Sequence, residues 1–298
     1  MSPSPALAAS LALLSALGFA FSTSFQHLAA GRVQLTVTHP LLVLLQLLRS
    51  PRWLAGSTIG LTAWLLHAVA LNLGTLALVQ PLILLGVVLA VLVRSGLDRR
   101  WPRNHELIGV AVTIASLIAV VSVADTSHEG RAAPTGWMLA VAGTGVVIAL
   151  VVTRFANQMP RRGVAAFVLG MTAGMLFGIT ACLMKVVGQA ISDHGFVGFL
   201  ATWSPWVLLS CALLAMSLNQ RAYQLSRLSH SMPVLNVTSV LLSIVLGALL
   251  FDESLPTSPL TLAIQAVGLL GIAWGLFRIA DAGASSRRVS DSPRRSAT

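Results

Sequence analysis

Long apolar runs recur along the whole chain, and short polar stretches separate them. Each run approaches the roughly 20 residues that an α-helix needs to cross the hydrocarbon core of a bilayer. The polar breaks divide the chain into nine predicted spans at 6 to 30, 52 to 73, 75 to 96, 105 to 124, 136 to 154, 164 to 190, 197 to 219, 227 to 251 and 258 to 280. The pattern therefore predicts an all-α polytopic membrane protein with nine transmembrane helices.

A tenth apolar segment, HPLLVLLQLLRSP at 39 to 51, is too short to cross and is bracketed by prolines. We expect it to be an interfacial or re-entrant piece. The first apolar run has no Lys or Arg before it, whereas a secretory signal has a positive n-region. We interpret that run as a retained first span.

Charge supports the same arrangement. Only 9% of residues are charged, and the loops after the first, third, fifth, seventh and ninth predicted spans hold almost all of the 19 Lys and Arg residues. Of the others, Arg131 lies on an opposite loop and Lys185 lies within a span. By the positive-inside rule, the N-terminus is outside and the C-terminus is cytoplasmic, in the cell (cytoplasmic) membrane. The net charge of +10 thus reflects orientation, and no basic folded domain for nucleic acid is present.

The domain organisation follows from these spans. Residues 1–282 form one predicted transmembrane domain, and the polar segment 283–298 cannot bury enough apolar surface to order itself, so we expect a disordered cytoplasmic tail. Cys182 and Cys211 fall inside apolar runs, where thiols pack as small hydrophobes.

An internal repeat is detectable. LNLGTLALVQPLILLGVVLAVLV from Leu71 aligns with YQLSRLSHSMPVLNVTSVLLSIV from Tyr223, and GFAFSTSFQH from Gly18 aligns with LFGITACLMK from Leu176. The repeats cover 6–124 and 164–280, with 136–154 as a connector helix. An odd connecting helix inverts the second repeat, an architecture typical of secondary transporters.

The segments MPVLNVTSVLLSIVLGALLFDESL and AIQAVGLLGIAWGLF resemble the closing hairpin of the drug/metabolite transporter superfamily, the EamA-like permeases. LNLGTLALVQPLILLGVVLAV and LLFGITACLMK are more similar to its NIPA-like branch, which includes magnesium transporters and many actinobacterial proteins. The resemblance implies an inverted-repeat permease. Two departures are that the corner reads FDES instead of Gly-Glu, and that LDRR in the first half has no matching acid.

Lys185 is the principal charged candidate, because a charge inside a span is costly and is a functional hypothesis by default. It shares a helix face with Gly174, Gly178, Ala181 and Gly188, a small-residue stripe that indicates a close helix contact or a cavity wall. The alternatives are a substrate-site lysine and a lysine that snorkels to the interface.

The first span carries a polar cluster formed by Ser22, Thr23, Gln26 and His27. Ser22 and Gln26 share a face with Ser15 and Gly18, so an inward-facing pathway is one interpretation. The other is that the hydroxyls bond to carbonyls one turn earlier and that His27 meets the cytoplasmic interface.

His67 lies near the middle of the second span, either as a proton relay or as a neutral hydrogen-bonded imidazole.

Pro81 and Pro233 correspond in the repeat. Each frees a carbonyl, and helices broken at corresponding positions indicate a transporter's binding site. Proline is also an ordinary helix opener. The polar residues beside these prolines complete the candidate pathway set: Gln80, His230, Ser231 and Asn236.

Asp252 and Glu253 follow the eighth span. We expect a solvated loop corner, with capture of an external cation as the alternative. No acid lies in the interior of any predicted span. Magnesium usually takes one or two carboxylate ligands, so this absence weakens the magnesium function that the NIPA-like resemblance implies.

We therefore expect a secondary transporter that moves a small organic solute, anionic or zwitterionic, by alternating access. The alternatives are a NIPA-like magnesium transporter and a non-transporting membrane scaffold. The chain has no buried carboxylate pair, zinc-ligand spacing or nucleotide-binding glycine loop, so we expect no enzyme and no cofactor. Expected partners are membrane lipid and the transported solute or ion, with a homodimer as one possible assembly and no nucleic acid.

Overall fold

The computed structural model describes residues 4–30, 50–97, 101, 104–124, 133–156, 158–159, 162–225, 228–254 and 258–290. Within these residues the chain is helical and contains no strand. The helices are α1 (Pro5–Ala30), α3 (Pro51–Leu73), α4 (Leu76–Ile83), α5 (Leu85–Leu97), α6 (Asn104–Ser122), α7 (Thr135–Ala156), α8 (Arg162–Gly198), the short 3-10 helix η1 (Phe199–Ala201), α9 (Ser204–Leu225), α10 (Leu228–Phe251) and α11 (Pro259–Ser290).

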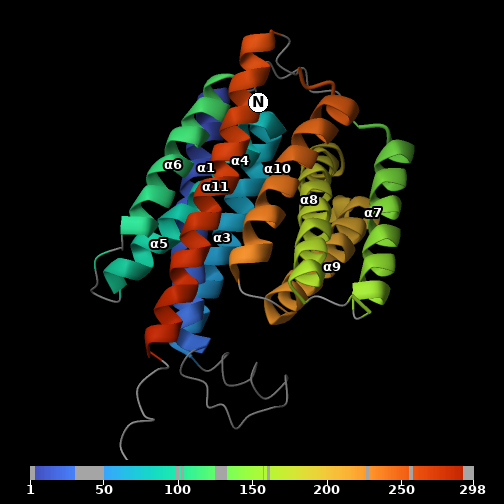
Figure 1. Cartoon of the computed structure of the whole chain (residues 1–298). Helices are drawn as coiled ribbons and strands as arrows, with labels where there is room; N and C mark the ends of the chain where they lie inside the picture. Colours follow the sequence, from blue (N-terminus) through green and yellow to red (C-terminus); the bar gives the residue numbers. More distant parts are fainter. Residues whose placement is uncertain are drawn as a thin grey trace, which may run out of the picture.

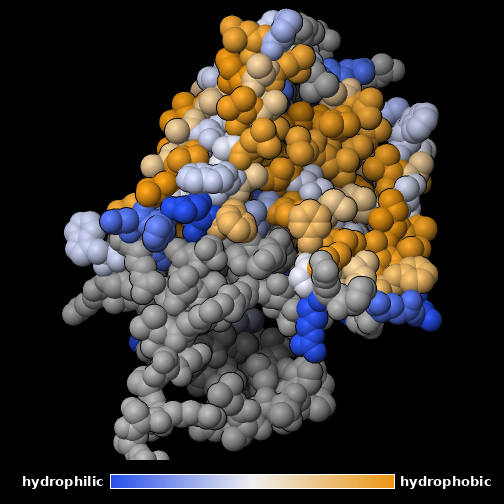
Figure 2. All heavy atoms as spheres, in the orientation of Figure 1, coloured by the Kyte–Doolittle hydropathy of each residue, from blue (hydrophilic) through white to orange (hydrophobic). Residues whose placement is uncertain are grey.

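The helices have the length and composition of membrane spans. Among the described residues, 8 helical segments are long and apolar enough to cross a bilayer, α4 and α5 together forming one of them, and Ser204–Asn219 of α9 is a shorter apolar helix. Large apolar side chains such as Ile118, Leu249 and Leu270 are exposed, and the visible face of the bundle in Figure 2 is mostly hydrophobic. The prediction of an all-α, multi-pass membrane protein is confirmed at this level.

The helices pack in two groups. The first is formed by α1 and α3 to α6, and the second by α8 to α11. Helix α1 lies against α3, α4 and α5, and α8 lies against α9 and α10. Helices α6 and α11 pack against each other, and α7 lies at one edge of the bundle beside α8 and α9 (Figure 1). The two groups meet where α6 packs against α11, where α10 contacts α4 and where α3 contacts α8.

Glycines allow several of these helices to approach closely. A Cβ atom added at Gly174 would overlap the carbonyl of Leu235, and one at Gly178 would lie 2.9 Å from the carbonyl oxygen of Ser239. The part of the predicted small-residue stripe at Gly174 and Gly178 is therefore a close contact with α10, whereas a Cβ atom at Gly188 would overlap the Asn72 side chain of α3. In the other group, a Cβ at Gly86 would lie 2.8 Å from the carbonyl oxygen of Ala16.

The third predicted span is formed by two consecutive helices, α4 and α5. After α3 ends, Gly74 and Thr75 are extended, and the side chain of Thr75 caps α4 by accepting a 3.3 Å bond from the Leu78 N–H. Leu84 then separates α4 from α5. Gly74 packs against Ala8 of α1, which leaves no room for a side chain at that turn.

The two corresponding prolines have different outcomes. Pro81 lies inside α4, which ends two residues later, whereas Pro233 lies inside α10, which continues to Phe251. Of the two interpretations, a broken helix does not describe α10 at Pro233, which lies in the second turn of a continuous helix. A proline in the second turn removes one backbone hydrogen bond, and the rest of a long packed helix tolerates that loss.

Two further predictions concern the ends of elements. Helix α11 extends to Ser290, so 283–290 is helical, where a disordered tail had been predicted, and 291–298 lies outside the described residues. The predicted interfacial segment 39–51 falls almost entirely on 31–49, which are also outside them. Only its end is described, where Ser50 caps α3.

Candidate functional site

A buried ion pair joins α8 to the segment that follows α10. The Nζ atom of Lys185 lies 2.5 Å from Oε1 of Glu253, and the two side chains are 2% and 4% exposed. A lysine in a bilayer-spanning helix is retained when it faces the interior and has a partner. Lys185 therefore does not snorkel to the interface, which excludes one of the two interpretations of this residue.

The local backbone directs Glu253 into the interior. Helix α10 ends at Phe251, and Asp252 adopts a left-handed conformation with φ of 52°. The chain then turns back, and the Glu253 N–H donates a 3.2 Å bond to the carbonyl oxygen of Gly247. Gly247 is needed here, because a Cβ atom at this position would lie 2.6 Å from Oε2 of Glu253.

The second oxygen of the same carboxylate binds the start of α4. The Leu76 N–H donates a 2.8 Å hydrogen bond to Oε2 of Glu253. This N–H is one of those that a helix leaves unpaired at its N-terminus, where the helix dipole also favours negative charge. Glu253 therefore lies between an ammonium group and a helix N-terminus, and it links three elements that are distant in sequence.

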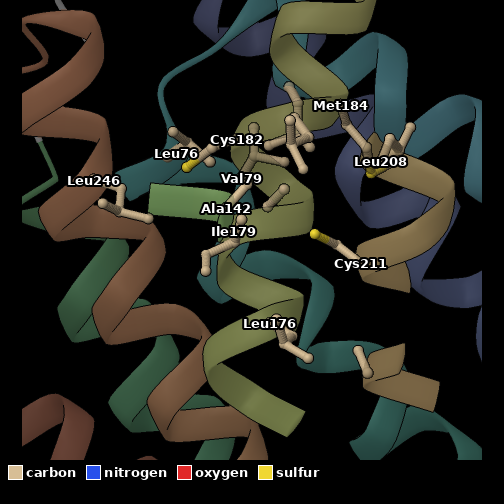
Figure 3. Close-up of a cluster of buried hydrophobic side chains, with 14 of the residues drawn as sticks. Leu76, Val79, Ala142, Leu176, Ile179, Cys182, Met184, Leu208, Cys211 and Leu246 are labelled. Atoms are coloured by element: carbon tan, nitrogen blue, oxygen red, sulfur yellow. The ribbon is translucent and has the colours of Figure 1, made fainter. Parts of the chain in front are cut away.

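Apolar side chains enclose this cluster. The ring of Phe251 lies 4.9 Å from Lys185 Nζ, in the range of a cation–π interaction. Figure 3 shows Leu76 and Val79 of α4 near Cys182 of α8, and all three belong to the main buried cluster. Water is thus largely excluded from the pair, which strengthens the attraction between the two charges.

The prediction that Glu253 belongs to a solvated loop corner is wrong, because its side chain is buried. Asp252 is exposed, so the two adjacent acids lie in different environments. One feature of the sequence pointed to this arrangement. A lone lysine inside a span requires a buried counter-charge, and Glu253, which follows α10, supplies it.

Two further predicted residues are buried polar groups. His67 is 7% exposed and Gln80 is 4% exposed, and among the residues that the structure describes neither His67 Nδ1 nor Gln80 Nε2 has a hydrogen-bond partner. Gln80 is four residues after Leu76 on α4, so the two share a helix face and Gln80 lies about 6 Å further along the axis.

The first-span cluster is only partly described. Ser22 is buried in α1, while the side chains of Thr23, Gln26 and His27 lie outside the described residues. The nearby Ser15 hydroxyl donates a 2.8 Å bond to the carbonyl oxygen of Ala63 on α3. This part of the polar face of α1 therefore contributes to packing against α3.

The predicted residues around Pro233 are also only partly described. Pro233 is buried and Asn236 is half-buried on α10, and the side chains of His230 and Ser231 lie outside the described residues. Among the residues that the structure describes, no group of three or more His, Cys, Asp or Glu side chains is placed to hold a metal ion.

Comparisons with known proteins place the chain beside one uncharacterized relative. No family model matches it, and no solved structure matches it. An uncharacterized protein of Corynebacterium glutamicum is 25% identical over 247 residues, which are 83% of this chain and 85% of that protein. The similarity covers most of both chains and carries no activity with it.

Proposed function

We propose that this protein is a secondary transporter of the drug/metabolite transporter type, with nine spans arranged as two inverted four-helix repeats around α7. It moves a small organic solute, anionic or zwitterionic, across the cytoplasmic membrane by alternating access, with the N-terminus outside and the C-terminus in the cytoplasm. The observation that carries this proposal is the buried Lys185–Glu253 pair at the N-terminus of α4.

The place of this pair supports a transport role. It lies where α8 and the segment after α10 meet the N-terminus of α4, and helix N-termini that point at anionic substrate groups are a feature of inverted-repeat transporters. The pairings support the repeat as well: α1 with α3 and α5 corresponds to α8 with α9 and α10. In addition, α6 and α11 run antiparallel, since Gly109 meets Gly275 while Val120 meets Gly268.

Magnesium transport has less support from the described geometry. Glu253 is a carboxylate of the kind that magnesium binds, yet one of its oxygens is bound by Lys185 and the other by the Leu76 N–H. A magnesium ion at this position would have to replace an ammonium that is fixed on a helix.

A scaffold role predicts that the pair affects only stability or assembly.

The experiment uses purified protein in liposomes loaded with a mixture of amino acids, carboxylic acids and sugars. Depletion of each solute is measured by mass spectrometry, and magnesium entry is followed with a trapped fluorescent indicator. The comparison variant is the double substitution Lys185→Met, Glu253→Gln, which keeps shape and removes both charges. We expect depletion of one class of organic solute by wild type only. Magnesium entry alone, or no flux by folded wild type, would contradict the proposal.

A further inference from the structure

We infer that Lys185 and the N-terminus of α4 form a binding site for a carboxylate group, and that Glu253 occupies this site as an internal competitor. A solute that bears a carboxylate displaces Glu253 and takes its two contacts. This inference rests on the proposed transport function and names the chemical class of the solute.

The two groups that hold Glu253 have the chemistry of an anion site. The ammonium of Lys185 binds one carboxylate oxygen, and the first N–H of α4 binds the other. This arrangement matches a bidentate carboxylate, with a full positive charge on one side and the positive end of a helix on the other. Any other carboxylate at the same place would find the same two donors.

The site has donors that Glu253 leaves unused. A lysine ammonium carries three N–H groups, and Glu253 is the hydrogen-bond acceptor that the structure gives for Lys185. One turn along the same face of α4, the Nε2 atom of Gln80 is buried without a partner. A ligand with more acceptor atoms than the glutamate side chain can therefore accept further hydrogen bonds from the Lys185 ammonium.

Glu253 and Lys185 are carried by different kinds of backbone. Residues Asp252 to Ser254 are non-helical and follow a left-handed turn, and the Glu253 N–H donates a bond to the carbonyl oxygen of Gly247. Lys185 projects from the middle of α8, which packs against α9 and α10. Exchange at the acid is therefore easier than exchange at the cation.

Charge balance favours a carboxylate over a cation as the ligand. When one carboxylate replaces another, the net charge of the buried site stays the same, so no additional charge loses its hydration. A cation that entered beside Lys185 would add a second positive charge to a site with one carboxylate. The ligand is thus an anion or a zwitterion that binds through its carboxylate.

The test is chemical rescue of a vacated site in the full-length protein. Glu253→Ala removes the internal carboxylate, and sodium acetate is the probe, with sodium chloride at equal concentration as the salt control. Thermal unfolding in detergent is followed by tryptophan fluorescence. We expect acetate at about ten times its Kd to raise the Tm of Glu253→Ala by about 3 °C and to leave wild type unchanged.

Two control variants assign the effect to this site. In the double variant Lys185→Met, Glu253→Ala the acetate shift should disappear, because the ammonium that binds the probe is gone. In Asp252→Asn, which alters the adjacent exposed acid, acetate should have no effect. If Glu253→Ala does not fold, Glu253→Gln takes its place, and we expect a smaller but measurable shift because an uncharged amide competes less strongly than a carboxylate.

The inference is overturned if acetate fails to stabilise the Glu253 variant, or if it stabilises wild type and the double variant equally. Methylammonium chloride is the control with the opposite charge. If this cation raises the Tm of Glu253→Ala, the site binds cations and the inference is wrong. Binding of acetate needs no flux, so rescue in a protein that transports nothing would reject the transport function alone. Flux without rescue would reject the carboxylate site alone.

Discussion

The two helix groups contribute different chemistry to the same place. The group of α1 and α3 to α6 supplies the buried N-terminus of α4, whose Leu76 N–H binds Glu253. The group of α8 to α11 supplies both charges, Lys185 and Glu253, beside an uninterrupted α10. Related sequence patterns have therefore produced an asymmetric site, in which one group offers backbone donors and the other offers side-chain charge.

The largest expected effect comes from removing one charge and leaving the other buried. Lys185→Met and Glu253→Gln should each destabilise the protein by about 3 to 5 kcal/mol, because an unpaired buried charge loses its hydration without compensation. The double variant should recover most of that loss. Chemical unfolding of the purified protein measures the three free energies.

The matched control for this cycle is Arg154→Met, at an exposed position in the last turn of α7, which should change stability by about 0.5 kcal/mol or less. If the two single losses simply add in the double variant, the charges do not stabilise one another. The contact between Lys185 and Glu253 would then result from packing of the surrounding helices alone.

The next effect tests whether the two helix groups are equally tightly packed. Gly174→Ala in α8 and Gly86→Ala in α5 each place a methyl group against the backbone of a neighbouring helix, at Leu235 and at Ala16. Each should cost about 1 to 3 kcal/mol, because backbone atoms cannot move aside as a flexible side chain can. Thermal unfolding measures both.

Gly143→Ala is the control for these glycine variants, since a Cβ atom there has no neighbour within 4 Å and alanine is the better helix former. We expect it to be neutral or slightly stabilising. A Gly174→Ala protein as stable as Gly143→Ala would show that α8 and α10 separate freely, which would remove the support for a fixed Lys185.

A smaller effect distinguishes packing residues from pathway residues in the first group. His67→Leu and Gln80→Met each remove a buried nitrogen that has no partner, so stability should rise by about 1 kcal/mol. Solute flux should fall in the same variants if these side chains face the pathway. The liposome assay and thermal unfolding are measured on the same preparations.

Thr113→Val provides the comparison, because the Thr113 hydroxyl is buried and already donates a 2.7 Å bond to the carbonyl oxygen of Gly109. It should not gain stability and should not lose flux. Unchanged flux in both His67→Leu and Gln80→Met would mean that these two side chains do not line the pathway, which would then be limited to the part of the site with Lys185 and Glu253.

The sequence predicted the elements well for a physical reason. Apolar runs of bilayer length encode helices directly, so most predicted boundaries fall within a few residues of the observed ones. The stripe of Gly174, Gly178 and Lys185 also predicted one face of α8 correctly, because helical periodicity fixes which residues share a face.

The site was harder to predict, because it depends on contacts between distant segments. Glu253 is 68 residues from Lys185 and 177 residues from Leu76. Its position after an apolar run resembled a solvated corner, and the left-handed turn at Asp252 that directs it inward has no clear local signal. Equally, Pro81 and Pro233 look alike in sequence, and only packing decided that one helix ends while the other continues.

The smallest expected effect concerns the ring beside the pair. Phe251→Leu should weaken stability by about 0.5 to 1 kcal/mol through the lost cation–π contact with Lys185, in addition to the cost of the smaller side chain. The same substitution in the Lys185→Met, Glu253→Gln background lacks the cation and should show only the packing cost. The difference between the two backgrounds isolates the contact. Equal costs in both would mean that Phe251 acts only as a hydrophobic cover, and that the charges of the second group are stabilised by each other and by the α4 N-terminus of the first.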